Sequence, residues 1–229
     1  MSNFYSHGKK HLIAVDCIIF GFDDEGLKLL LFNRKVDPEK GRWSLLGGFI
    51  NNNESVDDAA LRVLSEITGL SNIYLEQLYT YGEVERDTGA RVISIAYYAL
   101  IKSNEYSEKL NHHHDAKWFS IDNVPDLIFD HNIMVEKALA RLQRKSKIQP
   151  IGFELLPKKF TIPQLQKLYE AIFQKKFDKR NFRKKIISLK TLKKYEEKDK
   201  LNSKKGAYLY SFDKTKYKKL LEKGYHFEI

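Results

Sequence analysis

The chain has 229 residues, of which 42% are hydrophobic and 31% are charged, and its formal net charge is +10. This composition is that of an ordinary folded protein, neither disordered nor embedded in a membrane. The longest apolar runs are too short to cross a bilayer, and the first residues lack the apolar core of a signal peptide. The single cysteine, Cys17, cannot form a disulfide within the chain and is expected to be a small buried hydrophobe. We therefore expect a cytoplasmic protein.

The charge is divided unevenly along the chain. Residues 1–150 hold 18 Lys+Arg and 21 Asp+Glu, a net charge of −3, whereas residues 151–229 hold 22 and 9, a net charge of +13. Two modules with different partners are indicated. A module as basic as the second attracts polyanions, of which nucleic acid is the usual one. The alternative is a solvated, lysine-rich surface.

The first part of the chain alternates between strand and helix patterns. Residues 11–20 and 28–33 are rich in β-branched and aromatic residues, which predicts two strands, with a turn over residues 21–26 between them. Residues 55–68 show helical periodicity, opened by the capping pair Ser55 and Asp58 and ended by Gly69. Further strands are predicted at residues 74–81 and 91–101, and a helix at 131–145. This order indicates a layered α+β domain.

The second part begins after a linker predicted at residues 148–152. Thr161-Ile162-Pro163-Gln164 forms a capping box with an early proline, so a helix is expected to follow. Asp178 is a good cap for a second helix, whose apolar stripe is Phe182, Ile186 and Leu189. Two short helices in this spacing suggest a helix-turn-helix. A strand at residues 206–212, preceded by the basic turn of Lys204 and Lys205, suggests the wing. The expected domains are therefore residues 1–147 and 148–229.

Residues 48–70 carry the most specific pattern in the chain, GFINNNESVDDAALRVLSEITGL. Its spacing resembles the Nudix box, G-x5-E-x7-R-E-U-x-E-E-x-G-U, in which U is aliphatic. The positions in register are Gly48, Glu54, Arg62, Leu64, Glu66, Gly69 and Leu70. The resemblance implies a Nudix-homology α/β/α sandwich.

Two carboxylates of that box are missing. The box places carboxylates three and four residues apart on one helix, so that they converge on Mg²⁺, which polarises a pyrophosphate and activates a water. Here Val63 and Ile67 stand at two of the glutamate positions and offer no oxygen. We therefore expect no metal, no cofactor and no catalytic residue, and we interpret Arg62 and Glu66 as a structural ion pair.

A Nudix domain without catalysis can keep its pocket and bind a ligand as a signal. Nearly the whole chain resembles the NrtR-like transcriptional regulators, which join a Nudix-homology domain to a C-terminal winged helix. The resemblance outside the box lies in residues 43–48, 91–97, 150–157, 168–170 and 178–183. Some members of this group respond to ADP-ribose and control NAD synthesis, and others respond to a pentose and control sugar catabolism. Residues 15–23 look most like the L-arabinose-responsive branch, AraR, so L-arabinose is the expected effector and ADP-ribose the alternative.

Three residues are candidates for effector binding. Asp16 lies in an otherwise apolar strand, where a carboxylate needs a partner, either a ligand hydroxyl or a structural ion pair. Trp43 could stack on a sugar or adenine, or be a core aromatic. Arg91 could hold a phosphate or hydroxyl, or form a salt bridge. The run His112-His113-His114 is interpreted as a solvated loop and not as a metal site.

The DNA-binding candidates lie on the second helix and the wing. Lys179, Arg180, Asn181, Arg183 and Lys184 point away from the apolar stripe, and arginine suits guanine as asparagine suits adenine. Lys204 and Lys205 are expected to contact phosphates without reading sequence. Since one winged helix reads a half-site, a homodimer on a palindromic operator is expected.

Two functions of different classes remain open. The first is a regulator, most simply a repressor released from double-stranded operator DNA by its effector. The second is a Nudix pyrophosphohydrolase with a basic appendage that binds RNA or nucleotides. Val63 and Ile67 favour the regulator.

Overall fold

The computed structural model describes residues 8–106, 115–200, 206–225 and 227–229. Contacts divide the chain into two compact units, residues 1–21 with 28–138, and residues 22–27 with 139–229. This division by contacts falls inside a helix, and the expected domain boundary after residue 147 remains a prediction. The division lies there because the second half of this helix contacts the C-terminal helices, as when Gln143 Nε2 donates to the carbonyl of Ile172 at 3.1 Å. None of the described helices is both long and apolar enough to cross a membrane.

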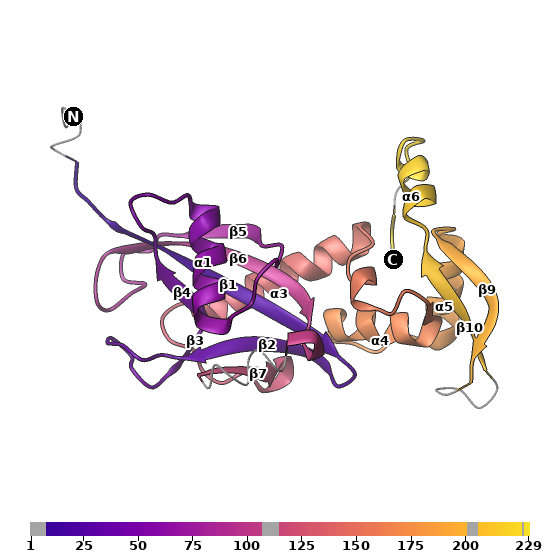
Figure 1. The fold of residues 1–229 in the computed structure, drawn as a ribbon, viewed down its shortest axis with the longest axis horizontal. Helices are drawn as coiled ribbons and strands as arrows, with labels where there is room; N and C mark the ends of the chain where they lie inside the picture. Colours follow the sequence, from indigo (N-terminus) through magenta and orange to yellow (C-terminus); the bar gives the residue numbers. More distant parts are fainter. Residues whose placement is uncertain (1–7, 107–114, 201–205, 226) are drawn as a thin grey trace. The chain divides into compact units, whose positions relative to one another are not determined.

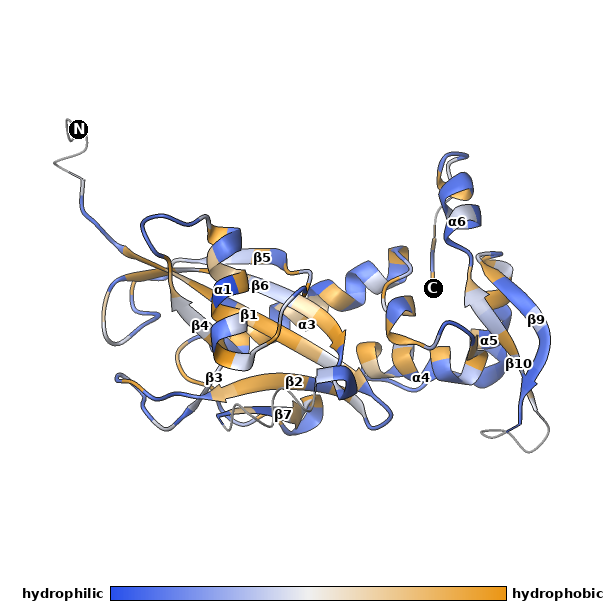
Figure 2. Ribbon diagram, viewed as in Figure 1, coloured by the Kyte–Doolittle hydropathy of each residue, from blue (hydrophilic) through white to orange (hydrophobic). Residues whose placement is uncertain are grey.

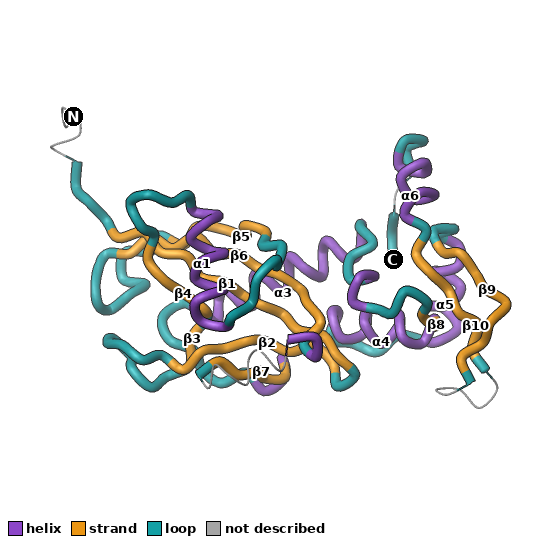
Figure 3. The backbone as a smooth tube through the Cα atoms, in the orientation of Figure 1, coloured by secondary structure: helices purple, strands orange, loops and turns teal. Residues whose placement is uncertain are grey.

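The first unit is built on a seven-stranded sheet with the strand order β3-β2-β1-β6-β5, in which β4 also pairs with β1 and β7 with β2 (Figure 1). The strands are β1 (Leu12–Asp23), β2 (Gly26–Asn33), β3 (Trp43–Ser44), β4 (Leu46–Phe49), β5 (Glu76–Tyr81), β6 (Val92–Lys102) and β7 (Ala116–Ser120). The helices are α1 (Val56–Thr68) and α3 (His131–Ile148), with 3₁₀ turns at Asn104–Tyr106 and Ile121–Asn123. Figure 3 shows α1 and α3 in purple beside the orange strands.

Successive side chains of β1 point to opposite faces of the sheet, and each face packs against a different helix. Val15, Cys17 and Ile19 belong to one apolar cluster with Ala60 and Val63 of α1. The residues between them, including Asp16, point to the opposite face, because successive side chains of a strand alternate. His131, the first residue of α3, lies against Asp16 on that face. The α/β/α sandwich expected from the sequence is confirmed.

Helix α1 has the ends that its sequence predicts. The Ser55 side chain accepts the backbone N–H of Asp58, and a serine cap of this kind contributes about 1 kcal/mol. Gly69 adopts φ 70°, a left-handed conformation that glycine takes at no steric cost, and ends the helix. Cys17 is fully buried, its thiol donates to the carbonyl of Ala60, and burial raises the pKa of that thiol. It is therefore a small core residue, as expected.

One local prediction in this unit was wrong. The turn expected over residues 21–26 is reduced to Asp24 and Glu25, because β1 continues to Asp23 and β2 begins at Gly26. Gly21 lies inside β1, where a Cβ atom would approach the ring of Trp118 to 2.6 Å. This glycine makes room for an aromatic ring instead of bending the chain.

The second unit is a winged helix. It contains a 3₁₀ turn at Phe153–Leu155, β8 (Phe160–Thr161), α4 (Ile162–Phe173), α5 (Lys179–Ser188), β9 (Leu192–Asp199), β10 (Ala207–Phe212) and α6 (Lys214–Leu221). The three strands form a sheet of order β8-β10-β9. Strand β9 comes from the charged stretch before the basic turn, where the wing interpretation implied a strand but the sequence gave no bounds for it, and α6 was not predicted. Figure 2 shows β9 blue, hence hydrophilic, along most of its length.

The two predicted helices of the helix-turn-helix are confirmed with their caps. Thr161 and Gln164 form the reciprocal capping box of α4, and the Asp178 side chain accepts the N–H of Asn181 at the start of α5. Phe182, at 5% exposure, packs between the rings of Tyr169 and Phe177. The helices therefore meet through the apolar stripe that the sequence indicated.

Candidate functional sites

The residues that match the Nudix box form an ion-paired network around Arg62. Its guanidinium donates two hydrogen bonds to Glu54, at 2.6 and 2.8 Å, one to Glu66 at 3.0 Å, and one to the carbonyl of Phe49. Hydrogen bonds from Arg62 and from the backbone of Asn51 lower the pKa of Glu54 to about 2. Both remaining carboxylates of the box are thus engaged by one arginine, and they tie the loop before α1 to the helix.

The positions that lack carboxylates point into the core. Val63 is 2% exposed, Ile67 packs against the same apolar cluster, and a Cβ atom at Gly48 would approach Val63 to 2.8 Å. Mg²⁺ requires several oxygen ligands. Within the described residues, no three His, Cys, Asp or Glu side chains gather where they could hold a metal. The residues present therefore do not fit the metal of catalytic Nudix proteins.

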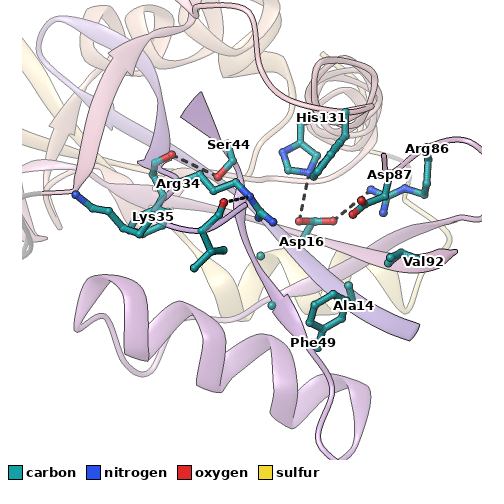
Figure 4. Close-up of a pocket in the computed structure, with 15 residues that line it drawn as sticks. Ala14, Asp16, Arg34, Lys35, Ser44, Phe49, Arg86, Asp87, Val92 and His131 are labelled. Carbon is teal, nitrogen blue, oxygen red and sulfur yellow. Dashed lines mark hydrogen bonds and ion pairs between the residues drawn. The ribbon is translucent and has the colours of Figure 1, made fainter. Parts of the chain in front are cut away.

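A cavity of about 250 Å³ opens beside the box (Figure 4). Aromatic and cationic side chains both line it: Phe32, Phe49 and Phe129, and Arg34, Lys35 and Arg86. Arg34 Nε donates to two carbonyls, those of Val36 and Pro38, and its guanidinium lies 5.6 Å from the Phe129 ring centroid. The cavity thus combines apolar faces with cations, and the carboxylates of Asp16 and Asp87 also line it.

Its floor is a buried cluster of charged groups that includes Asp16. The Asp16 carboxylate accepts a hydrogen bond from Ser94 at 2.5 Å and lies 3.6 Å from the Arg86 guanidinium. Arg86 is 7% exposed and donates two hydrogen bonds to Asp130, at 2.7 and 3.0 Å. Figure 4 shows Asp16 between Arg86 and His131. Of the two roles left open for Asp16, the structural ion pair is present, and the residue also borders the cavity.

His131 completes this cluster in its neutral form. Its Nδ1 accepts the backbone N–H of Leu45 at 3.1 Å, which requires an unprotonated nitrogen, and its Nε2 lies 3.5 Å from Asp16. Burial lowers the pKa of His131, and the nearby carboxylates of Asp16 and Asp130 only partly oppose this effect. The residue therefore links α3 to the segment between β3 and β4.

The close approach of β1 and β4 under the cavity depends on Gly47. Asp16 and Gly47 are register partners in this antiparallel pair, and a Cβ atom at Gly47 would collide with the Asp16 carboxylate. Glycine at this position therefore leaves space for the buried acid. The sequence alone gave Gly47 no role.

The other two effector candidates lie elsewhere. Trp43 is half-buried and packs edge-to-face on Phe119, with ring centroids 4.8 Å apart. Arg91 donates to the carbonyl of Glu83 at 2.9 Å. Neither is among the described residues that line the cavity. The sequence missed Arg34, Arg86 and His131, because nothing local distinguishes them from solvated charges.

Helix α5 exposes the side chains that the sequence singled out. Lys179, Arg180, Asn181, Arg183 and Lys184 are all exposed, whereas Phe182, Ile186 and Leu189 are buried. The cap at Asp178 binds the backbone N–H of Asn181 and leaves its side-chain amide exposed. The helix therefore presents a basic face of the kind that enters a major groove.

The wing combines lysines with tyrosines. Lys194 and Lys198 lie 3.9 and 4.7 Å from the ring centroid of Tyr208. Lys159 and Lys193 flank Tyr195 in the same way. Lys204 and Lys205 lie outside the described residues, as do His112, His113 and His114. The described strands of the wing therefore carry lysines stacked on tyrosines, but Glu196, Glu197 and Asp199 balance the three lysines of β9, and the predicted roles of the wing turn remain predictions.

Comparisons with known proteins agree with this two-part architecture. The NUDIX domain model matches residues 10–141, and the NrtR DNA-binding winged helix domain model matches residues 152–212. The ADPR responsive transcriptional repressor NtrR of Acinetobacter baylyi is 32% identical over 205 residues, covering 88% of this chain and 82% of that protein. The crystal structure of Shewanella oneidensis NrtR complexed with a 27mer DNA is 31% identical with a TM-score of 0.73, covering 87% of this chain and 93% of the other.

A further structure covers the first unit. The NUDIX domain of Shewanella oneidensis NrtR complexed with ADP ribose is 34% identical with a TM-score of 0.53, covering 62% of this chain and 94% of the other. The fold and these matches define a class of protein, a Nudix domain followed by a winged helix. Within that class, the chain belongs to the NrtR-like family of Nudix-related transcriptional regulators.

Proposed function

We propose that this protein is a transcriptional repressor that binds operator DNA through its winged helix and is released when ADP-ribose binds the cavity of its first unit. The observation that carries the proposal is the basic, exposed face of α5 on a confirmed helix-turn-helix. The relative from Acinetobacter baylyi and the DNA complex of Shewanella oneidensis NrtR support it.

The chemistry of the cavity favours ADP-ribose over L-arabinose. A pentose is uncharged and offers hydroxyls, whereas ADP-ribose carries a diphosphate and an adenine. Arg34 and Lys35 offer cations for the diphosphate, whereas the charge of Arg86 is already balanced by Asp16 and Asp130. Phe49, which is 52% exposed, offers a ring face for a base. The relatives with ADP-ribose in their names point the same way. The L-arabinose interpretation drawn from residues 15–23 therefore gives way to its alternative.

Calorimetry with the full chain tests the effector. We expect ADP-ribose to bind and L-arabinose to give no heat above dilution. Phe49→Ala should weaken ADP-ribose binding, because it removes an exposed ring from the cavity. Tyr74→Ala removes an aromatic side chain of 82% exposure that does not line the cavity, and should leave binding unchanged. Binding of L-arabinose without binding of ADP-ribose would reverse the assignment.

We further propose that the protein does not hydrolyse its effector. Arg62 engages both remaining carboxylates of the box, and Val63 and Ile67 face the core. After incubation of ADP-ribose with Mg²⁺ and the protein, chromatography should show no AMP above the level without protein. Turnover at an ordinary enzymatic rate, of order 1 per second or faster, would contradict this.

The expected homodimer belongs to the same proposal. One α5 helix spans only a half-site, so two copies are needed for a palindromic operator. The first unit is the expected contact, because the second units carry a net charge of +13 over residues 151–229 and repel each other. Sedimentation of the free protein should give twice the mass of the chain. A monomer with a footprint of a single half-site would refute this expectation.

A further inference from the structure

The chain continues beyond the matched winged-helix region, which ends at residue 212, and forms an additional docked element. This element consists of α6 and the residues that follow it. The Tyr217 ring lies 5.5 Å from that of Phe212 and 6.1 Å from that of Phe227, and Phe227 is 3% exposed. Helix α6 is thus packed on the second unit through an aromatic cluster.

This element is hydrogen-bonded to residues at the C-terminal end of α5. The Tyr225 hydroxyl donates to the carbonyl of Leu189, the residue that caps α5, at 2.9 Å. The backbone N–H of Asp213 donates to the carbonyl of Thr191 at 2.9 Å, and the Asp213 side chain caps α6. Both attachments lie within three residues of the end of α5, so the position of α6 is tied to that of the proposed recognition helix.

The exposed surface of α6 is basic. Its exposed lysines are Lys214, Lys216, Lys218 and Lys219, and the exposed Lys223 lies in the turn that follows the helix. Lys216, Lys219 and Lys223 follow the spacing i, i+3 and i+7, which places them along one side of the helix and its last turn. Among the described residues, none of these three ammonium groups has an ion-pair partner. We call this row the α6 lysine stripe. Like charges at such spacings repel one another, so the stripe offers a site to a polyanion.

We propose that the α6 lysine stripe binds the phosphate backbone of DNA beside the groove that α5 enters. The proposal rests on the DNA-binding function proposed above. With 1.5 Å of rise per residue, the ten residues of α5 span about 15 Å, whereas the major groove is about 12 Å wide. If the first turn of α5 reaches base edges, its last turn lies near the flanking phosphates, where Leu189 and Thr191 hold α6. Such contacts fix orientation and carry no sequence information.

The test uses the full chain without ADP-ribose and a duplex of about 30 base pairs of arbitrary sequence. The variant Lys216→Gln, Lys219→Gln, Lys223→Gln removes the stripe. The matched control replaces three exposed lysines of the first unit, Lys9, Lys10 and Lys40, with glutamine. Each lost phosphate contact reduces the magnitude of the slope of log affinity against log salt by about 0.9. The slope of the stripe variant should therefore be smaller in magnitude than that of the wild type by about 2.7. Between 50 and 200 mM salt, the wild type should lose roughly 40-fold more affinity than the stripe variant.

Replacement of the same three lysines by arginine separates charge from structure. Arginine keeps the positive charge, so this variant should keep the wild-type slope, whereas a purely structural role would not predict that rescue. An unchanged slope in the glutamine variant, with binding still reduced by Arg180→Ala, would overturn the α6 proposal alone. A wild type that binds no duplex at low salt would overturn both this proposal and the proposed function.

Discussion

The two units use charged side chains in opposite ways. In the first unit, Asp16, Arg86 and His131 are each less than a tenth exposed, and Arg86 and His131 both lie against Asp16 in the lining of a cavity. In the second, the lysines and arginines of α5 and α6 are exposed and have few acidic partners. Buried charges are held in one geometry by their partners and suit a small ligand of fixed shape. Exposed cations on rigid elements suit a long polyanion whose phosphates recur at regular spacing.

This contrast explains why the net charge indicates the kind of ligand for only one of the two units. The first 150 residues have a net charge of −3, although cations line the cavity within them. Some of their acids form ion pairs within the unit, as Asp130 does with Arg86. Salt screens the electrostatic attraction between the DNA-binding unit and a duplex, but it screens the interactions among the buried charges of the first unit much less. Mutations in the two units should therefore differ in kind.

The largest effect is expected from Arg86→Ala. This change leaves the buried carboxylates of Asp16 and Asp130 without their cation, and breaking a buried pair in this way costs about 3–5 kcal/mol. Urea denaturation would measure the loss. Arg91→Ala is the control, because within the described residues its guanidinium donates to the carbonyl of Glu83 and to no carboxylate, and it should cost less than about 1 kcal/mol. Equal losses in the two variants would show that the buried cluster does not stabilise the first unit.

An intermediate effect is expected at the DNA-binding surface. Arg180→Ala or Arg183→Ala should cost roughly 1–3 kcal/mol of operator affinity and relax specificity at one base pair, if that arginine reads a base. Lys204→Ala, in the wing turn, should instead weaken binding to all sequences alike and lower the salt slope by about one. Binding titrations on operator and mismatched duplexes separate the two outcomes. If the triple variant Arg180→Ala, Asn181→Ala, Arg183→Ala bound the operator with unchanged affinity, α5 would be excluded as the element that recognises the sequence.

The smallest effect is a dependence of stability on pH. Burial lowers the pKa of His131, so the folded protein keeps this imidazole neutral at pH values where the unfolded chain protonates it. Below the unfolded pKa of about 6.5, the unfolded state binds more protons, and stability falls as the pH decreases. The slope should reach at most about 1.4 kcal/mol per pH unit until the folded pKa is passed.

Unfolding curves between pH 5 and 7.5 would measure this dependence. His131→Gln removes the titrating group and should flatten the acidic side of the profile. His11→Gln changes an exposed histidine of the same unit and should leave the profile as it is. If His131→Gln retained the full wild-type slope, burial of this imidazole would not be its origin.

The sequence by itself determined the elements whose signals are local. The caps Ser55, Thr161 and Asp178 act on N–H groups three residues away, and Gly69 acts at its own position, so each can be predicted from a short window. The same holds for the Nudix box, whose fixed spacing identified the fold, and for the exposed face of α5, which is the complement of its apolar stripe. The charge of the second part indicated a polyanionic partner without any knowledge of the fold.

Only the tertiary structure decided which polar residues share a site. Asp16, Arg86 and His131 come from β1, from the loop between β5 and β6, and from the start of α3, separated by tens of residues along the chain. No local pattern pairs them, because strand pairing and helix packing bring them together. The same reason explains why Trp43 and Arg91, chosen for their chemistry alone, lie outside the cavity lining, and why Gly47 acquired a role only once its register with Asp16 was known.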